Sequence, residues 1–294
     1  LWPLAMPSPA PALPTFPGDN TRFVPGAGPV PSPLPETARC IVVADGDARL
    51  CDPAGAVLLP PAALEGLPCT ALHRLGTLDG VAVFAAGLEG PVPPAETPLR
   101  PVGLRALATT LEAPVWAAAA LAGQVMHWDR TTRFCGLCGA TATVPDLAQR
   151  AKVCTACGHS VWPRIAPCVI ALVLDDAGRM LLTRKAEWPT GRYGLVAGFV
   201  EPGETLEQCV VRECREETGV AVEAVTYRGS QPWPFPHQLM VGFRARAVST
   251  EVTAGDGELE DARWFARDAL PQLPPRLSIA RALIDEYLAE TTTV

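Results

Sequence analysis

Hydrophobic residues in the second half of the chain fall into short runs separated by turn residues, and this pattern predicts a domain rich in strands. Residues 169–174 form a continuous apolar run that is typical of a buried strand. Residues 175–178 follow as a hairpin turn, and residues 180–183 are the predicted partner strand. Further strands are predicted at 193–200, 222–229, 238–248 and 262–265, and helices at 206–218 and 279–288. Because strands and helices do not alternate regularly, we expect a mixed sheet in an α/β or α+β domain.

The first half of the chain has a different pattern. Residues 40–88 contain short apolar runs beside the turn signals Asp45-Gly46-Asp47 and Asp79-Gly80, which indicates a small, mainly β domain. Residues 98–129 are predicted to be helical, with a break at Ala113-Pro114 and an alanine-rich helix over 115–128. Residues 1–36 contain eleven prolines, which favour an extended arm over a packed unit.

These patterns divide the 294 residues into four segments. We expect a proline-rich arm at residues 1–36, an N-terminal domain at 37–130, a cysteine-containing unit at 131–162 and a C-terminal domain at 163–294. Chain length alone predicts roughly two globular units, and these four segments give a more specific division.

Charge and hydropathy exclude some function classes. The formal net charge is -7, which argues against a strongly basic nucleic-acid-binding surface. No apolar run approaches the ~18 residues that span a bilayer, so no membrane partner is expected. Residues 1–6 lack basic residues and their apolar run is interrupted by proline, so we expect no secretory signal and a cytoplasmic protein.

Four of the ten cysteines form two CxxC pairs with fifteen residues between them. Each pair is followed by a glycine, Gly139 or Gly158, where a tight turn requires positive φ. Two disulfides or a redox site are alternatives, but the doubled motif favours a zinc ribbon with one structural zinc ion per chain, because four thiolates complete its tetrahedral shell. His159 is then expected to be a solvated loop residue. The predicted zinc ligands are Cys135, Cys138, Cys154 and Cys157.

The other six cysteines show no paired spacing. They are predicted to be reduced and mostly buried thiols: Cys40, Cys51, Cys69, Cys168, Cys209 and Cys214.

The most informative segment is an acidic helix and the loop before it. Residues 201–204 form a Pro-Gly turn, Thr205 and Gln208 form a capping box that begins the helix, and Gly219 ends it. At about 100° per residue, Glu213, Glu216 and Glu217 share one face. A solvated acidic face is the simplest alternative. Since Arg212 can pair with Glu216 at i,i+4 but is not expected to neutralise the other two carboxylates, a divalent cation with oxygen ligands is the natural partner.

The same segment resembles a known family motif. Residues 198–220 match the Nudix box, G-x5-E-x7-R-E-U-x-E-E-x-G-U with U aliphatic, at eight of nine specified positions. Cys214 stands at the ninth position, and as a small apolar residue it should preserve the packing. The resemblance to Nudix hydrolases implies an α/β (α+β) Nudix fold, in which helices sandwich a mixed sheet, beside the zinc ribbon and the mainly β N-terminal domain.

A second motif narrows the resemblance to one branch. Residues 230–236 read SQPWPFP and resemble the SQPWPFPxS signature of NADH pyrophosphatases, and the zinc cysteines and residues 162–167 also resemble that branch. The resemblance covers roughly residues 115–290. It implies hydrolysis of the pyrophosphate of NAD(H) to NMN(H) and AMP, and removal of NAD caps from RNA 5′ ends.

The resemblance also implies site residues and partners. Glu213, Glu216 and Glu217 would be catalytic, and the Mg or Mn ligands would be these three glutamates with the Ala197 carbonyl and Glu258. Trp162 and Phe199 would stack on a base, with core packing as the alternative. In the family a homodimer completes the pocket. The remaining expected substrate contacts are Gln231, Pro232, Trp233, Pro234, Phe235, Pro236, His237, Gln238 and Ala280.

Two other functions are alternatives to this one. A Nudix enzyme for another dinucleotide such as ADP-ribose is disfavoured by the run at residues 230–236. A ligand-sensing regulator that contacts nucleic acid through the zinc ribbon is disfavoured by the complete set of glutamates. Gln238 departs from the serine of the signature, which leaves substrate preference among NADH, NAD and NAD-capped RNA undecided by the sequence.

Overall fold

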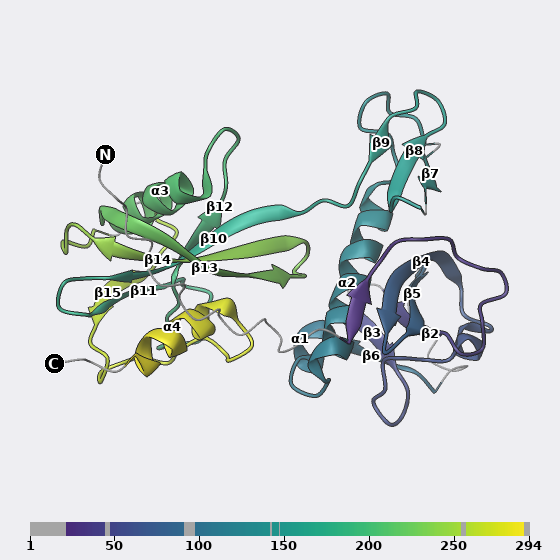
Figure 1. Ribbon diagram of the computed structural model, residues 1–294, viewed down its shortest axis with the longest axis horizontal. Coiled ribbons are helices and arrows are strands. Elements are labelled where there is room, and N and C mark those ends of the chain that lie inside the picture. Colours follow the sequence, from purple (N-terminus) through teal and green to yellow (C-terminus); the bar gives the residue numbers. More distant parts are fainter. Residues whose placement is uncertain are drawn as a thin grey trace, which may run out of the picture. The chain divides into compact units, whose positions relative to one another are not determined.

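The computed structural model describes residues 22–44, 48–90, 98–141, 143–146, 148–253 and 257–290, with the side chains of residues 143 and 144 left aside. The predicted turn at Asp45–Asp47 and the predicted arm up to residue 21 lie outside the described residues. The described chain forms two compact units, drawn in Figure 1. Among the described residues, the C-terminal unit contains Ala166–Pro232 and the chain from Gln238 on, and the N-terminal unit contains the chain from Arg22 to Ile165 together with Trp233–His237.

The C-terminal unit is built on a mixed sheet with strand order β13-β14-β10-β11-β15, and β12 also pairs with β10. The β10–β14 pair is parallel, whereas β10–β11, β10–β12 and β11–β15 are antiparallel. The strands are β10 (Ala166–Leu174), β11 (Met180–Arg184), β12 (Val196–Phe199), β13 (Val222–Trp233), β14 (Gln238–Ala247) and β15 (Asp261–Phe265).

Alternate side chains of β10 enter two different hydrophobic cores, one on each face of this sheet. Val169, Ala171 and Val173 pack with the helix α3 (Leu206–Thr218). Ile170, Leu172 and Leu174 pack with the helix α4 (Ile279–Ala289). The continuous apolar run of β10 therefore reflects burial on both faces. Figure 1 shows α3 and α4 on opposite sides of the sheet, and the predicted mixed sheet between helices is confirmed.

Strand β13 differs from its prediction, because it runs on to Trp233 instead of ending at residue 229. Proline usually interrupts a central strand, since it cannot donate a backbone hydrogen bond. β13 is the edge strand of this sheet, so Pro232 is tolerated within it.

The N-terminal unit contains a second six-stranded sheet, with order β1-β4-β5-β2-β3-β6. The alanine-rich helix α2 (Ala113–Thr131) packs across β1, β2, β4 and β5. A 3-10 helix at Pro61–Leu64 and the short helix α1 (Leu104–Leu107) come before it in the chain. The helical stretch predicted from residue 98 therefore begins only at Leu104, after β6. The strands are β1 (Phe23–Pro25), β2 (Arg39–Val43), β3 (Ala48–Cys51), β4 (Cys69–Leu78), β5 (Val81–Leu88) and β6 (Arg100–Gly103).

The part of the predicted proline-rich arm that the structure describes, from Arg22 on, packs on this sheet. Phe23–Pro25 pairs antiparallel with β4, and Phe23 is buried. Val30 and Leu34 pack against the core around Phe84. An extended, proline-containing chain can add an edge strand when its few apolar residues find a core, and this explains the difference.

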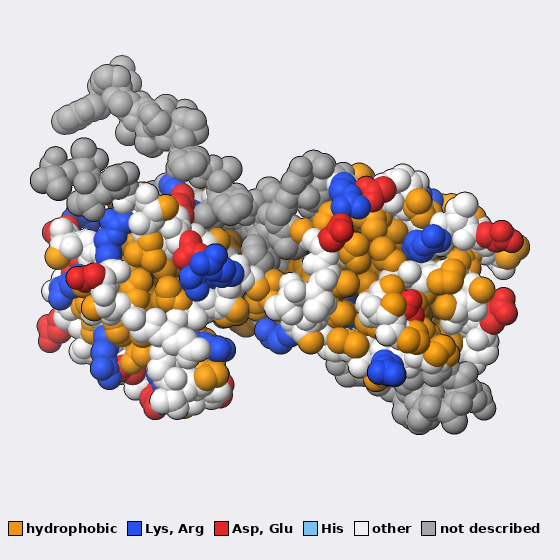
Figure 2. All heavy atoms as spheres, turned by 90° about the horizontal axis from the view of Figure 1, so that it is seen from below, with side chains coloured by type: hydrophobic (Ala, Val, Ile, Leu, Met, Phe, Trp, Pro, Cys, Tyr) orange, Lys and Arg blue, Asp and Glu red, His pale blue; other side chains and the backbone are white. Residues whose placement is uncertain are grey.

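The cysteine-containing unit is a three-stranded antiparallel sheet of β7 (Thr143–Asp146), β8 (Ala151–Cys154) and β9 (Ser160–Val161). No helix in the described part of the chain is long and apolar enough to cross a membrane. On the face shown in Figure 2, acidic and basic side chains are interspersed on both units, and no continuous basic surface is visible there.

Candidate functional site

The ends of helix α3 fix the positions of its glutamates. The Thr205 side chain accepts a hydrogen bond from the Gln208 backbone, and the Gln208 side chain accepts one from the Thr205 backbone, which is the predicted capping box. Gly219 ends the helix with a φ of 71°, a conformation that favours glycine. The helix therefore spans the predicted residues, and its two ends fix which residues lie on its acidic face.

Glu213 lies against strand β12. A Cβ atom built on Gly198 would lie 1.9 Å from the carboxyl carbon of Glu213 and 2.0 Å from its Oε1 atom. Because glycine has no side chain, the Glu213 carboxylate can occupy the space beside Gly198 that a Cβ atom would otherwise fill. Burial raises the pKa of Glu213, although Arg212 opposes that shift by hydrogen bonding to its charged form.

Glu217 is the buried carboxylate of the helix, with only 2% of its surface exposed. Burial, followed by the charges of Glu213 and Glu217, raises the pKa of the Cys168 thiol on β10 to about 12. Both carboxylates therefore lie on the sheet side of α3. Glu216 is different, because about half of its side chain is exposed.

Arg212 holds more of the acidic side chains than the sequence predicted. Its Nη1 atom lies 2.7 Å from Glu213 Oε1 and 3.0 Å from Glu216 Oε2. Its Nε and Nη2 atoms each donate to Glu204 at 2.8 Å, and Nη2 also donates to the Phe199 carbonyl at 2.9 Å. The expectation that Arg212 serves Glu216 alone is corrected, because a guanidinium presents five N–H donors in a fixed plane.

The sequence shows Glu204 only as the first specified glutamate of the motif, and the structure gives it a role. Its two hydrogen bonds from Arg212 lower its pKa to about 2, so at neutral pH it is a charged anchor for that arginine. The signal that could have identified it is the specified glutamate of the box at this position.

The remaining expected metal ligands are the Ala197 carbonyl and Glu258. Ala197 is on β12, beside Gly198, and pairs with Ile170 of β10. Glu258 is 64% exposed, with Oε2 3.4 Å from Lys185 Nζ. Within the described ranges, the four cysteines are the one group of three or more possible ligands gathered within 4.8 Å, so the structure does not bring these glutamates to a single point.

The expected substrate contacts in the C-terminal unit differ in how far they are exposed. Phe199 ends β12 and is 51% exposed, so its ring is available for stacking. Gln231 is fully buried, donates to the Leu277 carbonyl and accepts from the Ile279 N–H, and Ala280 is buried in the α4 core. Gln231 therefore anchors the start of α4. Gln238, the first residue of β14, is partly exposed and pairs with Ala166.

Apart from Pro232, which belongs to the C-terminal unit, the other expected substrate contacts belong to the N-terminal unit. Trp162 follows β9 and is 54% exposed. The loop Trp233–His237 is closed by a hydrogen bond from the Phe235 N–H to the Trp233 carbonyl, at 2.8 Å, and the two rings meet edge to face with centroids 5.1 Å apart. Pro234, which separates Trp233 and Phe235 in the sequence, is buried, whereas Pro232 and Pro236 are exposed.

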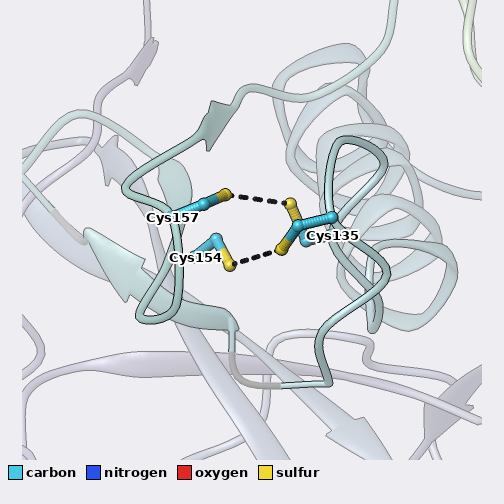
Figure 3. A group of neighbouring side chains, drawn as sticks. Cys135, Cys154 and Cys157 are labelled. Carbon is cyan, nitrogen blue, oxygen red and sulfur yellow. Dashed lines mark hydrogen bonds between the residues drawn. The ribbon is translucent and has the colours of Figure 1, made fainter.

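The four predicted zinc-ligand cysteines come together as expected (Figure 3). The Cys135–Cys157 and Cys138–Cys154 sulfur atoms are each 3.6 Å apart. A disulfide requires about 2.05 Å, whereas a tetrahedron with Zn–S bonds of about 2.3 Å has edges of about 3.8 Å. Gly139 and Gly158 have φ values of 74° and 75°, as the tight turn after each CxxC pair requires. The geometry fits a four-thiolate zinc site.

We expect the purified protein to contain about one zinc ion per chain, measured by plasma mass spectrometry. Cys154→Ser should weaken zinc binding by more than about 100-fold, because it removes one of four thiolates. Cys69→Ser, at an exposed cysteine on β4, is the matched control and should leave zinc content unchanged. Equal zinc retention in the two variants would contradict a zinc site at this quartet.

Three family models match successive parts of the chain. Residues 37–128 match the NADH pyrophosphatase-like rudimentary NUDIX domain, and residues 130–161 match the NADH pyrophosphatase zinc ribbon domain. Residues 164–287 match the NUDIX domain.

Curated relatives cover most of the chain. A protein of Pseudomonas aeruginosa named NAD-capped RNA hydrolase NudC is 43% identical over 228 residues, which are 76% of this chain and 80% of the relative. Proteins of the same name from Pseudomonas syringae and Deinococcus radiodurans are each 42% identical. They cover 85% and 77% of this chain, and 89% and 79% of their own lengths.

Proposed function

Because this chain belongs to the NADH pyrophosphatase branch of the Nudix hydrolases, we propose that it hydrolyses the pyrophosphate of NAD(H) to NMN(H) and AMP, and removes NAD caps from RNA 5′ ends. The observation that carries the proposal is the packing of α3 against β12, in which the Glu213 carboxylate lies against Gly198 and Glu217 is buried. The relatives' name and the SQPWPFP run support the choice of substrate.

The donor atoms of this site fit a divalent hard cation. Glu217 is a buried carboxylate, and buried charges in proteins are paired or bind metals. Glu213, Glu216, Glu217 and Glu258, with the Ala197 carbonyl, would hold Mg or Mn through oxygen atoms alone. Such an ion supplies Lewis acidity that offsets the charge of the diphosphate.

The residues of the chain divide the remaining work. Arg212, anchored by Glu204, orients the carboxylates of Glu213 and Glu216. Glu216 reaches solvent, so it is the carboxylate best placed to accept a proton from the attacking water. Phe199 presents an exposed ring on which a base of the dinucleotide stacks.

The zinc ribbon has a structural role in this proposal, because four thiolates leave no coordination position for substrate. We also propose a cytoplasmic homodimer, which the resemblance implies. Hydrolysis of ADP-ribose is the second candidate reaction, since it presents a similar diphosphate to the same carboxylates.

The proposal is tested by incubating the protein with Mg or Mn and, separately, NADH, NAD, ADP-ribose and 5′-NAD RNA, with products identified by mass. We expect AMP and NMN(H) from NADH, and loss of both products when a chelator removes the divalent ion. Glu217→Gln is the inactive control. The proposal is overturned when wild-type protein releases no AMP and NMN(H), when the control releases as much, or when ADP-ribose alone is cleaved.

A further inference from the structure

The N-terminal unit contains a polar cavity that the proposed mechanism does not use. Its volume is about 450 Å³, and the described residues that line it all belong to this unit. The start of β4 and the end of β5 form one side, the last turn of α2 forms another, and β8 of the zinc ribbon forms a third. The cavity therefore lies within one compact unit, where the zinc ribbon meets the β domain.

The buried charges in the wall of this cavity neutralise one another. Lys152 Nζ lies 3.2 Å from Asp129 Oδ1, and His73 Nε2 lies 3.0 Å from the same oxygen. Lys152 Nζ also donates to the Asp129 and Thr132 carbonyls, at 2.6 and 3.0 Å, at the C-terminal end of α2. The negative charge of Asp129 and the negative end of the helix are thus already covered. The side chains nearer to solvent therefore determine the charge that a ligand meets.

Two arginines and one glutamate are these outer side chains. Arg130 is partly exposed and donates to the Ala44 carbonyl at 3.3 Å, whereas Arg133 and Glu89 are exposed. Arg133 forms no hydrogen bond or ion pair with any residue that the structure describes. The excess of positive charge favours an anion, and the planar donors of a guanidinium match the oxygen atoms of a phosphate.

An exposed aromatic ring follows this arginine in the chain. Phe134 comes directly after Arg133, precedes the zinc-ligand Cys135 and is 62% exposed. A single exposed ring needs no explanation by itself. Beside a cationic cavity, however, it supplies the second of the two groups that bind single-stranded nucleic acids, which are cations for the phosphates and rings for the bases.

The backbone that presents Arg133 and Phe134 is held on both sides. The Thr132 N–H donates to the Trp128 carbonyl at 2.9 Å, and the Cys135 N–H donates to the Ala140 carbonyl at 2.9 Å. The two side chains therefore extend from a short segment between the end of α2 and the first turn of the zinc ribbon. Such preorganisation lowers the cost of ordering the site when a ligand binds.

We propose that this cavity and Phe134 form a binding site for single-stranded RNA, in which Arg133 pairs with a backbone phosphate and the ring of Phe134 stacks on a base. The inference rests on the proposed function, because capped RNA is one of the substrates proposed there, and it goes beyond it by giving the N-terminal unit an RNA site of its own. The net charge of -7 and the interspersed charges in Figure 2 limit the site to a few contacts.

The test measures binding of a fluorescein-labelled, uncapped single-stranded RNA of about ten nucleotides by fluorescence anisotropy. In Arg133→Ala, the slope of log K against log salt concentration should fall by about 0.7, as for one lost phosphate contact, so binding near ~0.1 M salt should be about fivefold weaker. Arg133→Lys keeps the charge and should recover most of the loss. Arg100→Ala, at an exposed arginine on β6, is the matched control and should leave affinity and slope unchanged.

The same assay tests the aromatic contact. Phe134→Ala should weaken binding by about fivefold or more, whereas Phe134→Tyr keeps a ring on which a base stacks and should bind as wild type does. The matched control is Leu137→Ala in the first turn of the zinc ribbon, where leucine is 70% exposed but has no ring. A duplex of the same sequence has its bases already stacked, so Phe134→Ala should leave duplex binding unchanged.

Glu89→Gln tests the charge of the cavity in the opposite direction. It removes the outer acidic side chain, so the RNA should bind about twofold more tightly. A substitution that only damages the fold does not tighten binding, so this variant also serves where Arg133→Ala or Phe134→Ala does not fold. Zinc content, circular dichroism and NADH hydrolysis of each variant should match wild type, because none of these residues belongs to the proposed catalytic site.

The outcomes separate this inference from the proposed function. Weaker RNA binding in Arg133→Ala and Phe134→Ala, with both controls unchanged, supports the site. The site is overturned when wild type does not bind the RNA, when the two variants bind it as wild type does, or when Leu137→Ala loses as much affinity as Phe134→Ala. If the RNA binds through these residues but wild type releases no AMP from NADH or NAD-capped RNA, the proposed function fails and the RNA site stands.

Discussion

Replacing Glu217 with glutamine is expected to lower kcat for NADH hydrolysis by about 1,000-fold, with little change in KM. Glutamine has nearly the same shape, so it fills the buried position, but it lacks the charge that a divalent ion requires. A divalent ion contributes several kcal/mol of charge stabilisation, and ~4 kcal/mol corresponds to about three orders of magnitude in rate. The measurement is steady-state kinetics at saturating Mg or Mn.

The matched control for this variant is Glu207→Gln, at an exposed glutamate in the first turn of the same helix. It removes one negative charge from α3 without touching the sheet side, and its kcat should stay within about twofold of wild type. Circular dichroism and thermal unfolding establish that both variants fold. A Glu217→Gln variant with wild-type kcat would exclude Glu217 from the metal site.

Replacing Gly198 with alanine is expected to lower kcat by about 100-fold, although no charged group is changed. The new methyl group would overlap the Glu213 carboxylate, which must then move away from β12. A shift of about 1 Å in a group that positions reacting atoms can reduce the rate by about 100-fold. Kinetics and a titration of divalent ion measure the effect, and the ion concentration for half-maximal activity should rise.

Gly103→Ala is the control for this substitution. Gly103 has a φ of -65°, and a Cβ atom there would meet nothing within 4 Å, so the same chemical change introduces no overlap. Its kinetic constants should match those of wild type. If Gly198→Ala behaved in the same way, the placement of Glu213 against β12 would have no part in catalysis.

The sequence predicted those elements whose signals are local. Helix α3 has the expected bounds because Thr205, Gln208 and Gly219 define its ends through contacts within a few residues. The resemblance to Nudix hydrolases rested on the same segment, and the family matches confirmed it. Strand β1 was missed, because its proline-rich sequence forms a strand only by pairing with β4, some fifty residues later.

For the candidate site too, the sequence predicted only what local patterns determine. Helical periodicity placed Glu213, Glu216 and Glu217 on one face, but it could not tell that Glu217 is buried while Glu216 reaches solvent. That difference depends on how α3 packs on the sheet. The burial of Gln231 under the start of α4 and the contact of Arg105 with Phe235 join residues far apart in the chain, so no local pattern could reveal them.

The buried cysteines of the fold determine where oxidants can react. Burial raises the pKa of the thiols of Cys40, Cys51, Cys168, Cys209 and Cys214, so at neutral pH they remain protonated and shielded. The thiolate is the form that peroxides attack, and metal-bound cysteines are thiolates. Oxidative damage should therefore begin at the zinc ribbon, whose Cys138 and Cys157 are exposed, and spare these five buried cysteines.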